Sequence, residues 1–142
     1  MAISDAHLSW ISERHQAVLV TLRSDGSPQT SNIAYDLLGG SARVSVTADR
    51  AKTHNLRRDP RGVLHVLGDS FWTYASVRVE ARLGPVTTSP CDEAGQELLD
   101  LYQRISASTH PDPQEFFDAM VAEKRLVLSL VPVSAVAQGL PD

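Results

Sequence analysis

The amino-acid sequence predicts a mainly β protein, a small closed or partly closed antiparallel β-barrel of six strands with peripheral helices. Three observations support this prediction. Short runs with the alternation of a half-buried strand recur along the chain. Tight turns join most of these runs. The helical patterns are clustered instead of alternating with the strands, which argues against a parallel α/β fold.

Six segments have strand patterns: residues 17–23, 29–38, 42–48, 62–68, 72–86 and 126–137. The turn at residues 24–27 joins the first two, and Gly39 with Gly40 turns the chain again. The fifth segment is long enough to need a bend. Pro132 inside the last one predicts an edge position or a bulge.

Four helices are predicted from caps and from helical spacing. Ser4 is a candidate N-cap of a short first helix, and Asp49 of a second helix that stops before Pro60. The spacing changes again at Ser89, which precedes a proline, and a last helix opens at Asp112. A chain of 142 residues has the size of one domain with one hydrophobic core, so we predict a single domain over residues 1–142.

The bulk composition excludes several classes of protein. A net charge of −4 with 21% charged residues argues against a general positive field for nucleic acid. The single cysteine, Cys91, cannot form an internal disulfide. The N-terminus does not resemble a signal peptide, and no apolar run approaches the ~20 residues that span a membrane. We therefore expect a cytoplasmic protein without a membrane or nucleic-acid partner.

Basic residues gather where the second helix begins. Five of the 13 Lys and Arg residues lie between residues 50 and 61. Free N–H groups and the helix dipole favour an anion there, Arg50 and Lys52 add charge, and Thr53 adds a hydroxyl donor. A phosphate would fit this arrangement. A solvated basic helix has the same composition, so composition alone leaves both interpretations open.

Two further groups are candidates for ligand contact. Gln29 and Ser31 alternate with Asn32 on a predicted strand, and polar side chains inside a barrel are costly unless they are bonded. An ordinary edge strand is the alternative for these residues. Trp72 and Tyr74, two positions apart, would share a face that stacks on a flat ring or fills a dimer interface.

Motifs for other chemistry are missing from the sequence. It has no nucleophile elbow, Walker loop or Gly-x-Gly-x-x-Gly run, and the five histidines lack metal-ligand spacing. We therefore predict no metal site and no catalytic side chain. A protein whose cofactor carries the reaction needs only anchoring groups and a shaped pocket.

Several runs resemble F420-dependent proteins of the pyridoxamine-phosphate-oxidase-like class. The most specific is Arg-Ala-Lys-Thr-His-Asn-Leu at residues 50–56, followed by Arg-Asp-Pro at 58–60. The other similar runs are residues 18–22, 25–29 and 31–32, with Trp72 and Tyr74. The resemblance implies a six-stranded antiparallel split β-barrel of the FMN-binding type. It also implies a homodimer with cofactor sites at the subunit interface.

The same resemblance implies ten cofactor-binding residues: Gln29, Ser31, Asn32, Ser45, Thr47, Arg50, Lys52, Thr53, Trp72 and Tyr74. The first three would border the deazaflavin ring of F420, and the next two lie on the strand that leads to its phosphate. Arg50, Lys52 and Thr53 would hold the phosphate. The two aromatic residues would approach from the partner subunit.

The function implied by the resemblance is an F420-dependent oxidoreductase that transfers a hydride between the cofactor and a small organic acceptor. An FMN-binding flavoprotein of the same fold and a non-catalytic F420 carrier stay open as alternatives. Dimer formation is also expected from apolar residues predicted to be exposed, namely Trp72, Val77 and Val79.

Overall fold

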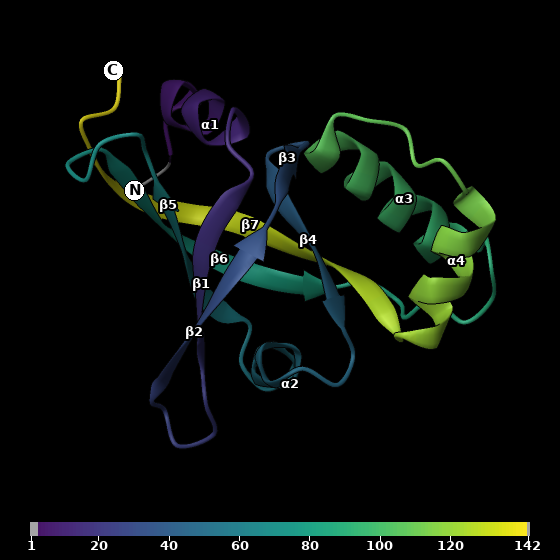
Figure 1. Cartoon of the computed structure of the whole chain (residues 1–142). Coiled ribbons are helices and arrows are strands. Elements are labelled where there is room, and N and C mark those ends of the chain that lie inside the picture. Colours follow the sequence, from purple (N-terminus) through teal and green to yellow (C-terminus); the bar gives the residue numbers. More distant parts are fainter. Residues whose placement is uncertain (1–2, 142) are drawn as a thin grey trace.

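The computed structural model describes residues 3–141 and contains one curled antiparallel sheet with four helices around it (Figure 1). The elements are α1 (Asp5–Ser12), β1 (Gln16–Leu22), β2 (Pro28–Ala34), β3 (Asp36–Leu38), β4 (Ser41–Thr47), α2 (Ala51–Arg58), β5 (Arg61–Leu67), β6 (Tyr74–Leu83), α3 (Glu93–Ser106), α4 (Pro113–Ala122) and β7 (Arg125–Gln138). The prediction of a mainly β split barrel is confirmed.

The sheet has seven strands instead of the predicted six, in the order β2-β1-β5-β6-β7-β4-β3. The difference arises at Tyr35, which divides the expected strand 29–38 into β2 and β3. β2 pairs with β1 at one end of the sheet, whereas β3 pairs with β4 at the other end. Because only Tyr35 separates them, the two ends of the sheet meet there, and β2 and β4 diverge beyond it.

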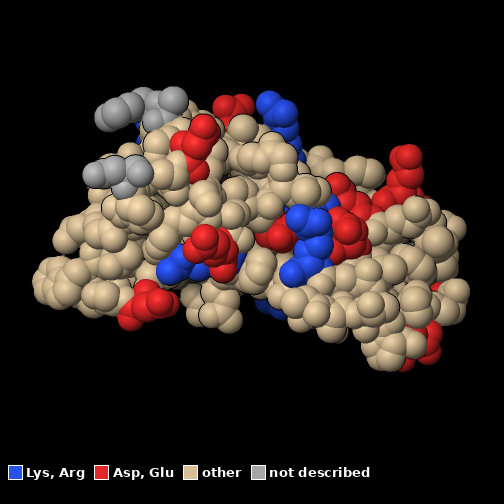
Figure 2. Space-filling view, turned by 90° about the horizontal axis from the view of Figure 1, so that it is seen from above, with Lys and Arg blue, Asp and Glu red and all other residues tan. Residues whose placement is uncertain are grey.

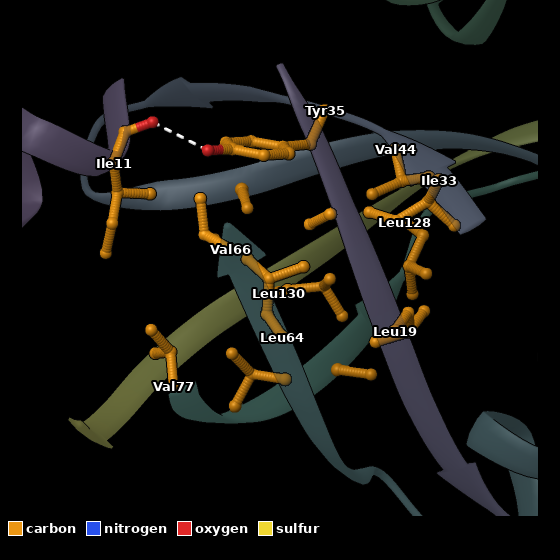
Figure 3. Close-up of a cluster of buried hydrophobic side chains, with 14 of the residues drawn as sticks. Ile11, Leu19, Ile33, Tyr35, Val44, Leu64, Val66, Val77, Leu128 and Leu130 are labelled. Carbon is orange, nitrogen blue, oxygen red and sulfur yellow. Dashed lines mark hydrogen bonds between the residues drawn. The ribbon is translucent and has the colours of Figure 1, made fainter. Parts of the chain in front are cut away.

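The barrel core lies between these strands (Figure 3). Leu19, Leu64, Val66 and Leu130 are fully buried or nearly so. Tyr35 is also fully buried, and its hydroxyl donates a 2.7 Å hydrogen bond to the Ile11 carbonyl, which fastens α1 across the end where β2 becomes β3. Burial raises the pKa of the Tyr35 hydroxyl well above its usual value.

The turns and the bulge follow the local sequence. Gly26, Gly39 and Gly40 all have positive φ, at 85°, 61° and 82°, where glycine carries no steric penalty. The register between β6 and β7 shifts where Val79 lies opposite Pro132. The bulge expected at Pro132 is therefore confirmed, and β7 is not an edge strand because β6 and β4 flank it.

Two predicted helix starts are confirmed and two are wrong. Ser4 and Asp112 cap α1 and α4 through their side chains. The N-cap of α2 is Arg50 and not Asp49, with no side-chain cap hydrogen bond. The helix expected from Ser89 instead begins after Asp92, whose carboxylate accepts hydrogen bonds from Thr87, Thr88, Ser89 and Gly95. These bonds hold the pKa of Asp92 well below its usual value.

Two valines of β6 that were predicted to be exposed are buried. Val77 and Val79 are buried in the barrel core, because the strand alternation turns Arg78 and Glu80 outward instead. Trp72 is exposed, as expected, but it lies in the turn before β6, so alternation does not place it on one face with Tyr74.

Helices α3 and α4 cover the outer face of β4 and β7 (Figure 1). Leu126 and Leu128 point into the barrel, whereas Val127 between them packs with Leu98 and Phe117 of the helices. Within residues 3–141, no helix is long and apolar enough to cross a membrane.

We predict that Tyr35→Phe destabilises the protein by about 1–3 kcal/mol, because the buried Ile11 carbonyl loses its donor. Urea unfolding monitored by circular dichroism measures this change. Tyr102→Phe is the matched control, since that hydroxyl is on an exposed residue and should matter little. Equal stability of Tyr35→Phe and wild type would contradict the proposed fastening of α1.

Candidate functional site

A cluster of cations lies where β4, α2 and β7 meet. Arg50 and Lys52 stand at the start of α2, and Arg125 begins β7 opposite Thr47 of β4. The Arg125 guanidinium lies 3.3 Å from the Ser45 hydroxyl and is paired with Glu123 at 3.0 Å. Within residues 3–141, neither Arg50 nor Lys52 forms an ion pair. The cluster therefore carries uncompensated positive charge.

The electrostatics of Lys52 reflect this excess. Partial burial lowers the pKa of its ammonium, and the neighbouring charges of Arg50 and Arg125 lower it further. An anion bound beside Lys52 would counteract the charges of Arg50 and Arg125 and raise the pKa of Lys52 again. The first N–H groups of α2 add to the attraction, because no side chain caps them.

The cations open onto a hollow of about 350 Å³, which we call the β2–β4 groove. Its floor is formed by β2 and β4 where they diverge, and its outer wall is apolar and comes from α3 and α4. The lining residues are Asn32, Ile33, Ala34, Val44, Ser45, Lys52, Leu98, Tyr102, Phe116, Met120 and Arg125.

The register shows that β2 presents free backbone groups to this groove. Pairs that exchange hydrogen bonds alternate along an antiparallel ladder. The Tyr35 N–H donates to the His15 carbonyl at 2.8 Å, and these two residues continue the β1–β2 register. Odd-numbered residues of β2 therefore bond to β1. The N–H and C=O groups of Asn32 and Ala34 point away from β1, toward β4.

The facing edge of β4 is free over its second half. The Ala48 N–H donates to the Lys124 carbonyl, so even-numbered residues of β4 bond to β7 and odd-numbered ones face the other way. β3 covers β4 only as far as Arg43. The Ser45 N–H therefore faces the groove beside Asn32 and Ala34. Two strand edges with alternating donors and acceptors suit a flat heterocycle that carries both.

A buried ion network holds α3 against the groove. Arg43 and Asp36 are both about 95% buried and lie 3.4 Å apart. Arg43 also pairs with Asp100 of α3 at 2.9 Å, and Arg104 of α3 reaches Asp36 at 2.7 Å. Because each buried charge has an opposite partner, this network is structural, unlike the cluster around Lys52.

The predicted site residues divide into two groups. Asn32, Ser45 and Lys52 line the groove, and Arg50 lies beside it. Thr53 is fully buried, and its hydroxyl donates to the backbone carbonyl of Thr47 at 2.7 Å, so the Thr53 side chain orders the turn before α2.

Gln29 and Ser31 share one face of β2, as alternation predicted, and the structure shows that this is the barrel side. Gln29 accepts a 3.0 Å hydrogen bond from Asn55, which also donates to Thr21. Gln29 therefore helps to fasten α2 to the barrel. No contact is recorded that gives Ser31 a similar task.

Trp72 and Tyr74 lie outside the β2–β4 groove of their own chain. Trp72 packs its ring edge-on against exposed Phe71, with centroids 4.9 Å apart. Tyr74 lies against His65 at 5.3 Å. The turn that carries Trp72 borders a second hollow, of about 640 Å³, which shares Asn32, Ile33 and Ala34 with the groove.

Sequence reasoning missed Arg125 and the helical wall of the groove. Residue 125 was left outside the predicted last strand, and only the pairing of β4 with β7 brings it beside Ser45. Leu98, Tyr102 and Phe116 come from α3 and α4, and the sequence does not show which strands these helices cover. Among residues 3–141, no group of three or more His, Cys, Asp or Glu side chains could hold a metal ion.

We predict that millimolar inorganic phosphate raises the melting temperature of the wild-type protein, because it neutralises the cations around Lys52. Lys52→Ala should lose most of this shift, measured by thermal unfolding against sodium chloride of equal ionic strength. Arg57→Ala, an exposed charge at the far end of α2, should keep it. Because the pKa of Lys52 is lowered, the increase in melting temperature should be lost at a lower pH than it would be for an ordinary lysine. An equal shift in all three proteins would place the anion elsewhere.

Comparisons with known proteins agree with this fold. A solved structure named F420 reductase has a TM-score of 0.68 at 20% identity, over 95% of this chain and 98% of that chain. A conserved hypothetical protein from Mycobacterium tuberculosis has a TM-score of 0.72 at 22% identity, over 100% and 91%. An FMN-binding protein related to pyridoxamine 5'-phosphate oxidase, from Nostoc punctiforme, has 0.64 at 15%, over 95% and 83%.

Similarity at the sequence level is more informative. An F420H(2)-dependent biliverdin reductase of Mycobacterium tuberculosis (strain CDC 1551 / Oshkosh) is 36% identical over 72 residues, 49% of this chain. The match spans about half of that relative, 53% of its length. The pyridoxamine 5'-phosphate oxidase family model matches residues 3–133, nearly the whole chain. The chain therefore belongs to the pyridoxamine 5'-phosphate oxidase family.

Proposed function

We propose that this protein is an F420-dependent oxidoreductase that transfers a hydride between F420 and a small organic acceptor. The observation that carries the proposal is the uncompensated charge around Lys52 at the end of a groove with free strand edges. A flat ligand with a phosphate at one end matches both features. The 36% identical relative, named as an F420H(2)-dependent reductase, favours F420 as that ligand.

The residues of the groove divide the binding of F420 between its two parts. Lys52 and Arg50, with the start of α2, hold the phosphate, and Arg125 supports them from β7. The free backbone groups of β2 and β4 hydrogen-bond the edge of the deazaflavin ring. Bound F420 supplies the hydride, so the chain has only to orient the acceptor and exclude water.

Pairing of two copies would complete the site. The outer face of the sheet has a hollow of about 430 Å³, lined by residues of β1, β5, β6 and β7. Apolar Val20, Leu22 and Val63 line it together with the charged residues Arg61, Arg78 and Glu80. Val133 in this hollow and Val136 beyond it are exposed, as are Leu67 and Trp72. Such an apolar surface suits a symmetric dimer, in which Trp72 and Tyr74 approach the groove of the partner subunit.

The net charge of −4 argues against a general nucleic-acid-binding role. On the face shown in Figure 2, Lys and Arg residues lie beside Asp and Glu residues and form no continuous basic area. FMN also carries a phosphate, so an FMN-binding protein is the alternative that has to be tested directly. A carrier would bind F420 without oxidising it in the presence of any acceptor.

We expect purified protein to bind F420 more tightly than FMN in a side-by-side fluorescence titration. Lys52→Ala should weaken F420 binding by about ten- to a hundredfold, the range for a lost hydrogen bond to a charged group. Arg57→Ala should bind normally. Equal or reversed affinities for the two cofactors would refute the F420 assignment, and normal binding by Lys52→Ala would refute the phosphate site.

We also expect a stable dimer in light scattering. Val133→Glu, which replaces an exposed apolar side chain of this hollow with a carboxylate, should shift the population toward monomer and weaken F420 binding together. Glu80→Gln, at the rim of the same hollow, is a milder control. A monomeric wild-type protein with full cofactor affinity would sink the shared-site arrangement.

A further inference from the structure

A further hollow adjoins the β2–β4 groove at Ala34, away from the cation cluster. This third hollow, of about 360 Å³, is lined by Arg14, His15, Gln16, Ala34, Leu67, Asp69 and Ile105. Ala34 on the free edge of β2 also lines the groove and the second hollow. The three hollows therefore meet along one strand edge.

One face of α3 connects the two ends. Leu98 and Tyr102 wall the groove, and Ile105 walls the third hollow. At a rise of 1.5 Å per residue, Leu98 and Ile105 are about 10 Å apart along the helix axis. A ligand anchored at Lys52 and lying along α3 would bring its far end toward Arg14 and His15.

His15 is held in one orientation. Its Nδ1 lies 3.0 Å from the Tyr35 carbonyl oxygen, which can only accept a hydrogen bond, so Nδ1 carries a proton. Tyr35 returns a bond from its N–H to the His15 carbonyl and is itself fixed to α1. Nε2 has no recorded partner among residues 3–141. It is therefore the ring nitrogen left free for a ligand or a proton.

Arg14 is positioned beside it. Its guanidinium stacks 3.8 Å from the centroid of the Trp10 ring and donates one 3.1 Å hydrogen bond to the Trp10 carbonyl. Within residues 3–141, its one ion pair is a long one with exposed Glu13, at 4.0 Å. Most N–H groups of the guanidinium stay free, while the stacking keeps its plane fixed.

We propose that Arg14 and His15 form the acceptor end of the site and are catalytic residues, an inference that rests on the proposed function. The acceptor carbon of a conjugated carbonyl receives the hydride from reduced F420, and the π electron pair moves through the conjugated system onto the oxygen. Arg14 hydrogen-bonds that oxygen as it becomes negative. Nε2 of a protonated His15 gives it a proton, and water later reprotonates the ring.

The charge around the hollow narrows the acceptor further. Asp69, in the turn between β5 and β6, lines the same hollow as Arg14 and His15, and Glu13 lies at Arg14. These carboxylates offset the charge of Arg14 and of a protonated His15, so the hollow does not require an acceptor that is already anionic. The acceptor is therefore a neutral conjugated carbonyl compound, whose negative charge appears only during reduction.

The test uses 4-nitrophenol, whose oxygen mimics the charged product oxygen and whose ionised form has a visible absorption band. We expect it to bind the wild-type protein, with and without F420, and to bind as the phenolate. Arg14→Gln should weaken binding by about tenfold or more and reduce the phenolate band. His15→Asn should do the same, because asparagine can keep the bond to Tyr35 but lacks Nε2. His54→Gln, on the exposed side of α2, is the control.

Thermal unfolding will check that each variant is folded. If His15→Asn does not fold, the binding of 4-nitrophenol by Arg14→Gln still tests the proposal. Loss of phenolate binding with F420 affinity retained supports the inference. Wild-type binding of 4-nitrophenol by both variants overturns it, and so does a wild-type protein that fails to bind the probe. Absence of F420 binding contradicts the proposed function instead, and the cofactor-free titration still reports on Arg14 and His15.

Discussion

The structure depends on one segment, β2 with β3, that runs without a break from one end of the sheet to the other. Residues 28–38 pair with β1 on one side of Tyr35 and with β4 on the other. The buried Tyr35 hydroxyl fastens this crossing to α1. Because the strands meet only there, β2 and β4 separate beyond it with their edges unpaired. The same contact that closes the barrel thus creates the groove, and it also fixes His15 at the groove's far end.

The distribution of charge separates stabilising groups from groups that await a ligand. Arg43 is buried, and Asp36 and Asp100 neutralise its charge, so these ion pairs hold α3 against the sheet. Lys52 is partly buried beside two further cations, and both its burial and these charges lower its pKa. A protein that retains such a cluster gives up stability, which binding of a phosphate would restore.

Local patterns predicted the fold well, and the site only in part. Alternation put Gln29 and Asn32 on opposite faces of β2, which the structure confirms. The run around Lys52 predicted the place where cations gather, and binding of an anion there stays a prediction. The caps of α2 and α3 were wrong by one and three residues, because Asp49 and Ser89 have capping side chains but the chain geometry uses Arg50 and Asp92. Arg125 could not be found, since its place beside Ser45 depends on strand register. No local pattern indicated that the Thr53 hydroxyl would donate its hydrogen bond to the backbone carbonyl of Thr47.

We propose that the free edges of β2 and β4 bind the cofactor. An amide NMR titration of the folded protein with F420 measures this binding residue by residue. The N–H signals of Asn32, Ala34 and Ser45 should shift most, together with those at the start of α2. Ser31 and Ile33, whose N–H groups bond to β1, should shift less. Unchanged signals at Asn32, Ala34 and Ser45 in a protein saturated with F420 would contradict it.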